Sequence, residues 1–374
     1  MKLEQARELE KRYIAQVFSR LPVLLIKGKG NYVYDDTGKK YLDLFAGIAV
    51  SSVGHAHPKV VKTLKDQASK LMHSSNWVYS EPQLELAETL VKITGMERVF
   101  YTNDGSGAVE TAFKLARKKT GKTQVISTEQ AFHGRTMGAL SATWTEKYRK
   151  PFEPLIPGFK FVRYNDVDAL RDAITDETAA MIVEPIQGEA GVVVPDADYL
   201  RMVRELTSEK GVVMIVDEIQ TGFGRTGRWF DYQRSGIRPD IVCMAKGIAG
   251  GFPMGAVAYR GMDFETGQHG GTFNGSPLAC AVANTVIDVI KRERLMENAG
   301  KMGSFLLKEL SDKGIRGRGL ILGVDVDDGH KRSVELIRRG AVAIYSGNTL
   351  RILPPLTIKK KEAQYIIRLI NEVA

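Results

Sequence analysis

The chain has little cysteine, and its histidines are few and scattered. Two cysteines cannot form a disulfide framework, and Cys243 and Cys280 both fall in apolar segments, so we expect them to be small buried residues. Of the six histidines only His55 and His57 lie close together, so no metal site is expected. No apolar run approaches the roughly 20 residues that span a bilayer. These absences argue against disulfide-rich, metal-centred and membrane-spanning proteins.

Acidic residues are fewer than basic ones, and the formal net charge is +9. A lysine-rich solvated surface accounts for this, and attraction of acidic substrates to a cationic cleft is the functional alternative. No basic run is interleaved with aromatic residues, so nucleic-acid binding is not expected. Residues 1–12 alternate in charge and lack the apolar core of a signal peptide, which predicts a cytoplasmic location.

From residue 83 onward, helical and strand-like patterns alternate. The short apolar runs lie at residues 99–101, 124–127, 159–163, 179–183, 211–216, 240–244 and 254–259. This alternation is typical of an α/β fold, in which helices cover both faces of a sheet rich in parallel strands. Such sheets bind ligands at the carboxyl ends of their strands.

The two ends of the chain have a different pattern. Residues 31–46 read as a hairpin, and residues 278–311 are expected to be one long helical stretch. Short strands and helices then follow, as in a smaller α+β domain. We therefore predict a large domain at 56–277 and a small discontinuous domain formed by 1–55 and 278–374.

Two ionisable residues end neighbouring apolar runs. Asp217 follows one run and Lys246 the next, about one strand–helix–strand unit later. A lysine can form a Schiff base with an aldehyde cofactor, and an aspartate can keep the ring nitrogen of that cofactor protonated. The pair therefore indicates pyridoxal 5′-phosphate (PLP). Gln220, three residues after Asp217, could bond the hydroxyl oxygen of the ring.

Two loops suit the remaining parts of this cofactor. Between an apolar run and a helix, the backbone N–H groups of Gly105 and Ser106 could hold a phosphate. The alternative there is a plain turn in which Asp104 caps the helix. Farther along, Phe132 could stack on the ring and Arg135 could bind a substrate carboxylate, although alone they are typical of a core and a surface residue.

The string from Val216 to Arg228, VDEIQTGFGRTGR, with Lys246 placed after it, resembles the class III aminotransferases of PLP fold type I. Supporting strings are found at 45–50, 54–58 and 269–272, and the resemblance runs from about residue 20 to the end. It implies a large domain with a mostly parallel seven-stranded sheet. Within the family the closest resemblance is to acetylornithine aminotransferases, and ornithine and carrier-linked lysine aminotransferases share much of it.

The resemblance also implies roles in binding the cofactor. Lys246 would carry PLP and move the proton between substrate and cofactor, and Asp217 would pair with the ring nitrogen. Gly105 and Ser106 would bind the phosphate. Thr272 would reach it from the other subunit of an obligate homodimer.

For the substrates, the resemblance implies that Arg135 takes a carboxylate and that Gly271 lies in the pocket near the dimer contact. Glu189 would pair with Arg351 in the first half-reaction. It would then open, so that Arg351 can bind the second carboxylate of glutamate or 2-oxoglutarate.

Several positions depart from the family pattern. Asp104 and Gly107 stand where serine and glutamate are common, and Gly271, Asn274 and Ser276 also differ. An aspartate pointing at the phosphate would repel it, so we predict that Asp104 turns away as a helix cap. These changes leave the PLP chemistry intact and bear on which substrate is used.

The expected activity is ping-pong transfer of the ω-amino group of N2-acetylornithine, or a similar N-acylated diamine, to 2-oxoglutarate, as in arginine biosynthesis. The alternatives are an aminotransferase for ornithine, 4-aminobutyrate or carrier-linked lysine, a PLP aminomutase, and an inactive PLP-binding scaffold. Glu189 and Arg351 favour a two-substrate transaminase, and Lys246 with Asp217 argues against the scaffold. The exact donor stays open at this point.

Overall fold

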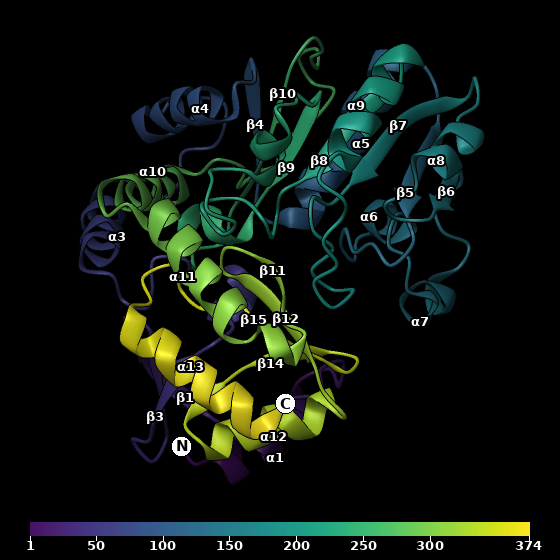
Figure 1. Ribbon diagram of the computed structural model, residues 1–374. Helices are drawn as coiled ribbons and strands as arrows, with labels where there is room; N and C mark the ends of the chain where they lie inside the picture. The colour runs from purple at the N-terminus through teal and green to yellow at the C-terminus, as the bar shows by residue number, and fades with distance from the viewer.

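The computed structural model describes all 374 residues, and its centre is a seven-stranded sheet in the order β4-β10-β9-β8-β7-β5-β6 (Figure 1). β10 runs antiparallel to both of its neighbours, and the other pairings are parallel. Every apolar run expected to be a strand forms one. The strands are β4 (Arg98–Thr102), β5 (Gln124–Thr128), β6 (Phe159–Val162), β7 (Thr178–Val183), β8 (Val213–Asp217), β9 (Ile241–Met244) and β10 (Gly255–Tyr259).

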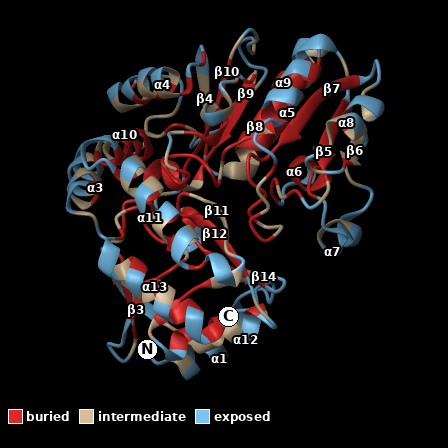
Figure 2. Ribbon diagram, viewed as in Figure 1, coloured by how far each residue is buried: buried red, intermediate tan, exposed pale blue.

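Helices cover both faces of this sheet. Along β8, Met214 and Val216 belong to one apolar cluster with Leu206 of α9 (Tyr199–Glu209), and Ile215 belongs to another with Ala112 of α5 (Gly105–Thr120). Because both faces are covered, every residue of β8 is buried, and Figure 2 shows the central strands buried beneath partly exposed helices. This explains the continuous apolar runs in the sequence.

Two smaller sheets lie below the large one in Figure 1. One has the order β1-β2-β3-β13 and the other β11-β12-β15-β14. β13 pairs in parallel with β3, so the two ends of the chain share a sheet, as a discontinuous small domain requires. The exact domain boundaries stay a prediction. The strands are β1 (Leu25–Lys29), β2 (Tyr32–Asp35), β3 (Lys40–Asp43), β11 (Arg316–Arg318), β12 (Ile321–Asp325), β13 (Ala341–Val342), β14 (Ile344–Ser346) and β15 (Thr349–Ile352).

The long helical stretch expected at 278–311 is present, but it is not one continuous helix. It is divided into α10 (Pro277–Arg292) and α11 (Leu295–Glu309), because the backbone of Arg294 takes a left-handed conformation with φ of 53°. α10 then packs on α3 and α4, and α11 on α13. The remaining helices are α1 (Leu3–Tyr13), α2 (Ala46–Ala49), α3 (Pro58–Lys70), α4 (Glu81–Thr94), α6 (Met137–Ser141), α7 (Glu146–Arg149), α8 (Val167–Ala173), α12 (Gly329–Arg338) and α13 (Lys360–Val373). None is both long and apolar enough to cross a membrane.

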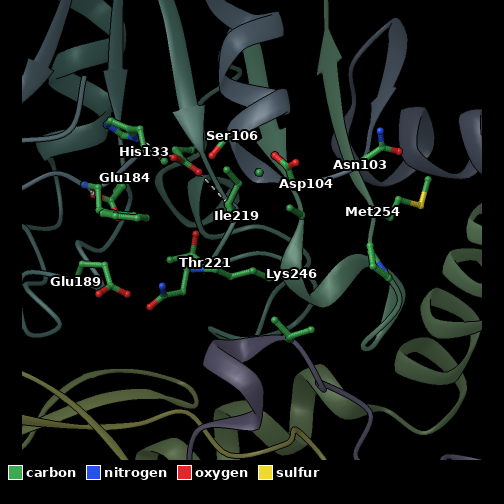
Figure 3. A pocket seen from close by; sticks show the side chains of 18 of the residues that line it. Asn103, Asp104, Ser106, His133, Glu184, Glu189, Ile219, Thr221, Lys246 and Met254 are labelled. Atoms are coloured by element: carbon green, nitrogen blue, oxygen red, sulfur yellow. Dashed lines mark hydrogen bonds and ion pairs between the residues drawn. The ribbon is translucent and has the colours of Figure 1, made fainter. Parts of the chain in front are cut away.

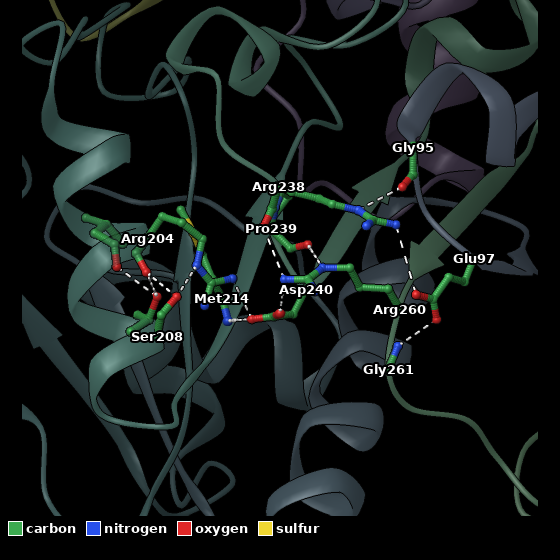
Figure 4. Close-up of polar contacts among 12 residues, drawn as sticks. Gly95, Glu97, Arg204, Ser208, Met214, Arg238, Pro239, Asp240, Arg260 and Gly261 are labelled. Atoms are coloured by element: carbon green, nitrogen blue, oxygen red, sulfur yellow. Dashed lines mark hydrogen bonds and ion pairs between the residues drawn. The ribbon is translucent and has the colours of Figure 1, made fainter.

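An ion-pair network ties the large sheet together at the edge where β8 and β9 begin (Figure 4). The carboxylate of Asp240, just before β9, accepts hydrogen bonds from Arg204 of α9 at 2.7 Å and from Arg260 after β10 at 2.9 Å. It also accepts the backbone N–H of Met214 in β8 at 2.9 Å. One carboxylate thus fixes the relative positions of the two strands whose far ends carry Asp217 and Lys246.

Candidate active site

A cavity of about 400 Å³ opens at the carboxyl ends of β8 and β9 (Figure 3). Asp217 is the last residue of β8, and Lys246 follows the end of β9 by two residues. Because neighbouring parallel strands end at the same edge, the two residues expected to act together line one cavity. Its lining also includes Asn103, Asp104, Gly105, Ser106, Phe132, His133, Glu184, Glu189 and Gln220.

Asp217 is held in place from two directions. One carboxylate oxygen lies 2.7 Å from Nδ1 of His133, and the other accepts the backbone N–H of Ile219 at 3.0 Å. Both side chains are buried, and Nε2 of His133 has no hydrogen-bond partner. No role is predicted for His133 from the sequence, because no residue spacing shows that a ring on one loop reaches a strand end far along the chain.

Lys246 stands in an unusual environment. Burial lowers the pKa of its amine, and the nearby Arg351 lowers it further, while Glu189 and Asp217 act in the opposite direction. Its backbone has φ of 44°, in the left-handed region that few non-glycine residues adopt. Strain of this kind persists only where the surroundings fix it, and it is frequent at functional sites. A lowered pKa makes more of the amine neutral and nucleophilic.

The start of α5 forms one wall of the cavity. Gly105 and Ser106 lie in its first turn, where backbone N–H groups have no partner within the helix. The carboxylate of Asp104 accepts the N–H of Gly107 at 2.7 Å, so the prediction that Asp104 caps this helix is confirmed. Asp104 nevertheless lines the cavity. Nearby, a Cβ on Gly134 would lie only 2.3 Å from Oγ of Ser106, so only glycine lets this loop approach.

Glu184 is a residue that sequence reasoning did not assign to the site. It follows β7, and its side chain accepts the backbone N–H of Phe132 at 3.1 Å. Burial raises its pKa to about 7, and Asp217 adds to this, while His133 and Lys246 oppose it. The available signal was an acidic residue at the carboxyl end of a buried strand, because Asp217 has the same position on β8. It was missed because only Glu189, five residues later, was assigned a role from the sequence.

Glu189 and Arg351 form the expected pair. A guanidinium nitrogen of Arg351 lies 2.7 Å from the Glu189 carboxylate, and another donates to Oε1 of Gln220 at 2.8 Å. Arg351 comes from β15 of the small sheet, and its side chain is only 2% exposed. Burial raises the pKa of Glu189, but Arg351 and Lys246 outweigh this, so that the pKa is lowered and the carboxylate stays charged.

A strained turn lies beside the cavity. Ala46, Gly47, Ile48 and Ala49 of α2 all have positive φ, which makes a left-handed helical turn. Such a turn costs about 1–2 kcal/mol for each non-glycine residue. The carboxylate of Asp43 accepts the first N–H of the turn at 2.8 Å and helps to hold it. The turn delivers the next residue, Val50, into the cavity wall.

Four expected site residues do not line the cavity in the single chain, and one of them, Arg351, lies behind the lining residues Glu189 and Gln220 that it bonds. The guanidinium of Arg135 lies 3.4 Å from the centroid of the Tyr148 ring, on the exposed side of its loop. Gly271 and Thr272 are exposed, and the carbonyl of Gly271 accepts a hydrogen bond from Asn76 at 3.4 Å. The roles expected for these four residues stay predictions.

The chain matches known proteins over nearly its whole length. Residues 13–374 match the family model described as aminotransferase class-III. The acetylornithine aminotransferase of Methanosarcina mazei is 48% identical over 97% of this chain and 94% of its own length. That of Methanothermobacter thermautotrophicus is 46% identical over 100% of this chain and 99% of its own.

Solved structures agree with this. The ornithine aminotransferase of Toxoplasma gondii has a TM-score of 0.95 and 35% identity, over 100% of this chain and 94% of that one. The acetylornithine aminotransferase of Elizabethkingia anophelis has a TM-score of 0.90 and 35% identity, over 99% and 98%. These likenesses cover both the large sheet and the small sheets, and they agree with the expected fold type I architecture.

Proposed function

This chain belongs to the class-III aminotransferase family, and we propose that it transfers the ω-amino group of N2-acetylornithine to 2-oxoglutarate, giving the semialdehyde and glutamate, as a step of arginine biosynthesis. It is a PLP-dependent transaminase. Six relatives named acetylornithine aminotransferase, 43–48% identical over nearly the full length, support the donor. Ornithine is the second candidate, because solved ornithine aminotransferases share the fold at 35% identity.

The cavity fits the cofactor. It combines an aromatic side chain, Phe132, a buried carboxylate, Asp217, and a lysine whose pKa is lowered. At one wall the first turn of α5 presents backbone N–H groups, which suit a phosphate. When bound, PLP supplies an electron-withdrawing ring that stabilises negative charge on the carbon carrying the transferred amine.

In this arrangement Asp217 would hold a proton on the ring nitrogen. An ionised carboxylate favours the protonated form of a neighbouring base. The bonds from His133 and from the N–H of Ile219 orient the carboxylate toward the cavity, so its geometry is set before any ligand arrives. Phe132 would stack on the ring, and Glu184 fixes the backbone of that stacking residue.

Lys246 would carry the cofactor and then act as the base that removes a proton from the amine-bearing carbon of the substrate. The same amine would return the proton to cofactor atom C4′. Its lowered pKa suits this work, because a neutral amine can accept a proton near neutral pH.

Glu189 and Arg351 would let one site serve two substrates. In the first half-reaction the pair stays closed, and the donor meets a neutral ion pair rather than a free guanidinium. In the second, Glu189 moves aside and Arg351 takes the additional carboxylate of 2-oxoglutarate in a two-pronged bond. Glu189 is the more exposed partner, with 34% of its side chain accessible against 2% for Arg351, so it is the one free to move.

A homodimer completes the proposal. Trp77, Tyr79 and Phe273 expose 94%, 91% and 63% of their surface, and large exposed apolar side chains are typical of interfaces. Phe273 is adjacent to Thr272, so pairing of this surface would carry Thr272 toward the phosphate of a partner subunit and Gly271 toward its substrate. The cytoplasmic location stays part of the proposal.

The observation that carries the function is the ion pair between the buried Arg351 and Glu189, because Glu189 lines the cavity that also holds Lys246. A donor panel tests the assignment: N2-acetylornithine, ornithine and 4-aminobutyrate, each with 2-oxoglutarate, compared by kcat/KM. We expect the first to lead. If ornithine or 4-aminobutyrate has the highest kcat/KM instead, that compound replaces N2-acetylornithine as the proposed donor. Turnover without any keto acid would indicate an aminomutase, and a cofactor band that glutamate does not bleach would indicate an inactive scaffold.

A further inference from the structure

Asp104, which caps α5, carries a negative charge that capping does not require. Asp104 accepts the N–H of Gly107 at 2.7 Å, and asparagine or serine caps a helix about equally well. The extra charge stands at the helix end where the macrodipole favours an anion. In Figure 3, Asp104 and Ser106 lie together at the start of α5 and above Lys246.

The same helix end is where the cofactor phosphate would be held. Once Asp104 has taken the N–H of Gly107, the first turn offers the N–H groups of Gly105 and Ser106, and Ser106 adds its hydroxyl. Asp104 is one of the residues that line the cavity containing these donors. A bound phosphate would therefore meet a second anion competing for the same dipole.

We propose that Asp104 is an internal competitor of the cofactor phosphate, which stabilises the cofactor-free chain and weakens its hold on PLP. This rests on the proposed placement of the phosphate at Gly105 and Ser106. The side chain is exposed, so water and salt screen the repulsion, and its effect is limited to about three- to tenfold in the dissociation constant. The effect falls on phosphate alone, because a cofactor without phosphate brings no anion to this wall.

Asp104→Asn isolates the charge, since the amide oxygen can still cap Gly107. PLP and pyridoxal, which lacks the phosphate, are titrated separately into the cofactor-depleted full-length chain, with cofactor fluorescence as the readout. We expect the substitution to tighten PLP about three- to tenfold and to leave pyridoxal unchanged. The inhibition constant of inorganic phosphate, measured by its competition with PLP, should likewise be lower in the variant than in the parent chain.

Asp328→Asn is the matched control. Asp328 caps α12 by accepting the N–H of Lys331 at 2.9 Å, and it is also exposed, but it does not line the cavity. Both substitutions should lower the Tm of the cofactor-free chain by about 1–2 °C, because each removes a charge from a helix N-terminus. Only Asp104→Asn should change PLP binding. This substitution should therefore lower the stability of the cofactor-free chain and at the same time tighten the binding of PLP.

Ser106→Ala separates the inference from the placement on which it rests. It should weaken PLP and leave pyridoxal unchanged. If it does so while Asp104→Asn leaves the ratio of PLP to pyridoxal affinity at the parental value, the placement stands and the competitor role is overturned. Ser106→Ala keeps the backbone N–H groups, so Ser106→Glu, which places another anion on the same wall, is the stricter test of the placement. If Ser106→Glu also leaves that ratio unchanged, the phosphate is bound elsewhere, and both the placement and the inference fail.

Discussion

Substitution of Arg351 should separate the two half-reactions. Its guanidinium is almost completely buried and is bonded to Glu189 at 2.7 Å and to Gln220 at 2.8 Å. If it binds the second carboxylate of glutamate, then Arg351→Ala removes a buried charged contact from that half-reaction alone. The half-reaction with the ω-amino donor proceeds with the pair closed and should depend on it far less.

The magnitudes follow from the burial. Loss of one partner from a buried, hydrogen-bonded charge pair costs about 2–5 kcal/mol, which is roughly 30-fold to several-thousand-fold in kcat/KM with glutamate. We expect the N2-acetylornithine half-reaction to change by less than about tenfold. Glu189→Gln should act in the opposite direction. In this variant the substrate glutamate no longer has to break the ion pair between residue 189 and Arg351. That pair is worth about 1.5 kcal/mol at a partly exposed carboxylate, so its loss should improve glutamate binding about tenfold.

Stopped-flow absorbance of the cofactor, with one substrate at a time, measures each half-reaction separately. Arg351→Lys keeps a charge if the alanine variant folds poorly, and thermal unfolding reports on folding. Arg332→Ala is the control, since it removes a guanidinium that is paired with Glu335 at 2.8 Å on α12, and neither of its partners, Glu335 and Asp327, lines the cavity. Equal losses in both half-reactions of the Arg351 variants would refute the idea of a switch.

Three further changes test other parts of the site. Lys246→Ala should abolish turnover and the cofactor adduct trapped by borohydride, and peptide mass mapping of the parent chain that places the adduct elsewhere would contradict the assignment. The pKa of Glu184 is raised to about 7 in the folded chain, so its contribution to the free energy of unfolding should fall by up to about 3 kcal/mol as pH rises from about 4.5 to about 7. Glu184→Gln should flatten this part of the pH profile measured by urea unfolding. An unchanged profile would argue against a protonated Glu184. Asp240→Ala should lower the free energy of unfolding by about 2–3 kcal/mol, because Arg204 and Arg260 lose their shared partner, whereas Asp168→Ala, which removes an exposed contact of 4.0 Å, should cost less than about 0.5 kcal/mol in the same urea titration.

Local patterns in the sequence were sufficient for the large sheet and for the ends of its strands. Continuous apolar runs mark strands that are covered on both faces, and the polar residue ending each run marks the edge where ligands bind. Asp217 and Lys246 were found in this way. The cap at Asp104 was predicted too, because capping depends on residues only three positions apart.

The small sheets were harder to predict from sequence. β1 and β11 are short and partly exposed, so they carry no continuous apolar run. The break between α10 and α11 has no glycine or proline, because a left-handed arginine ends the first helix. The segment thus has a helical pattern throughout, and only packing of α10 on α3 and α4, and of α11 on α13, requires the turn.

The sequence by itself therefore determined the order of the elements and the residues that end them, because these depend on side chains close together along the chain. The tertiary structure decided which distant side chains meet. His133 reaches Asp217 across 84 positions, a contact that was not predicted, and Arg351 reaches Glu189 across 162, a pair that only the family resemblance implied. Contacts of that span depend on how whole strands and loops pack, and no local periodicity records that packing.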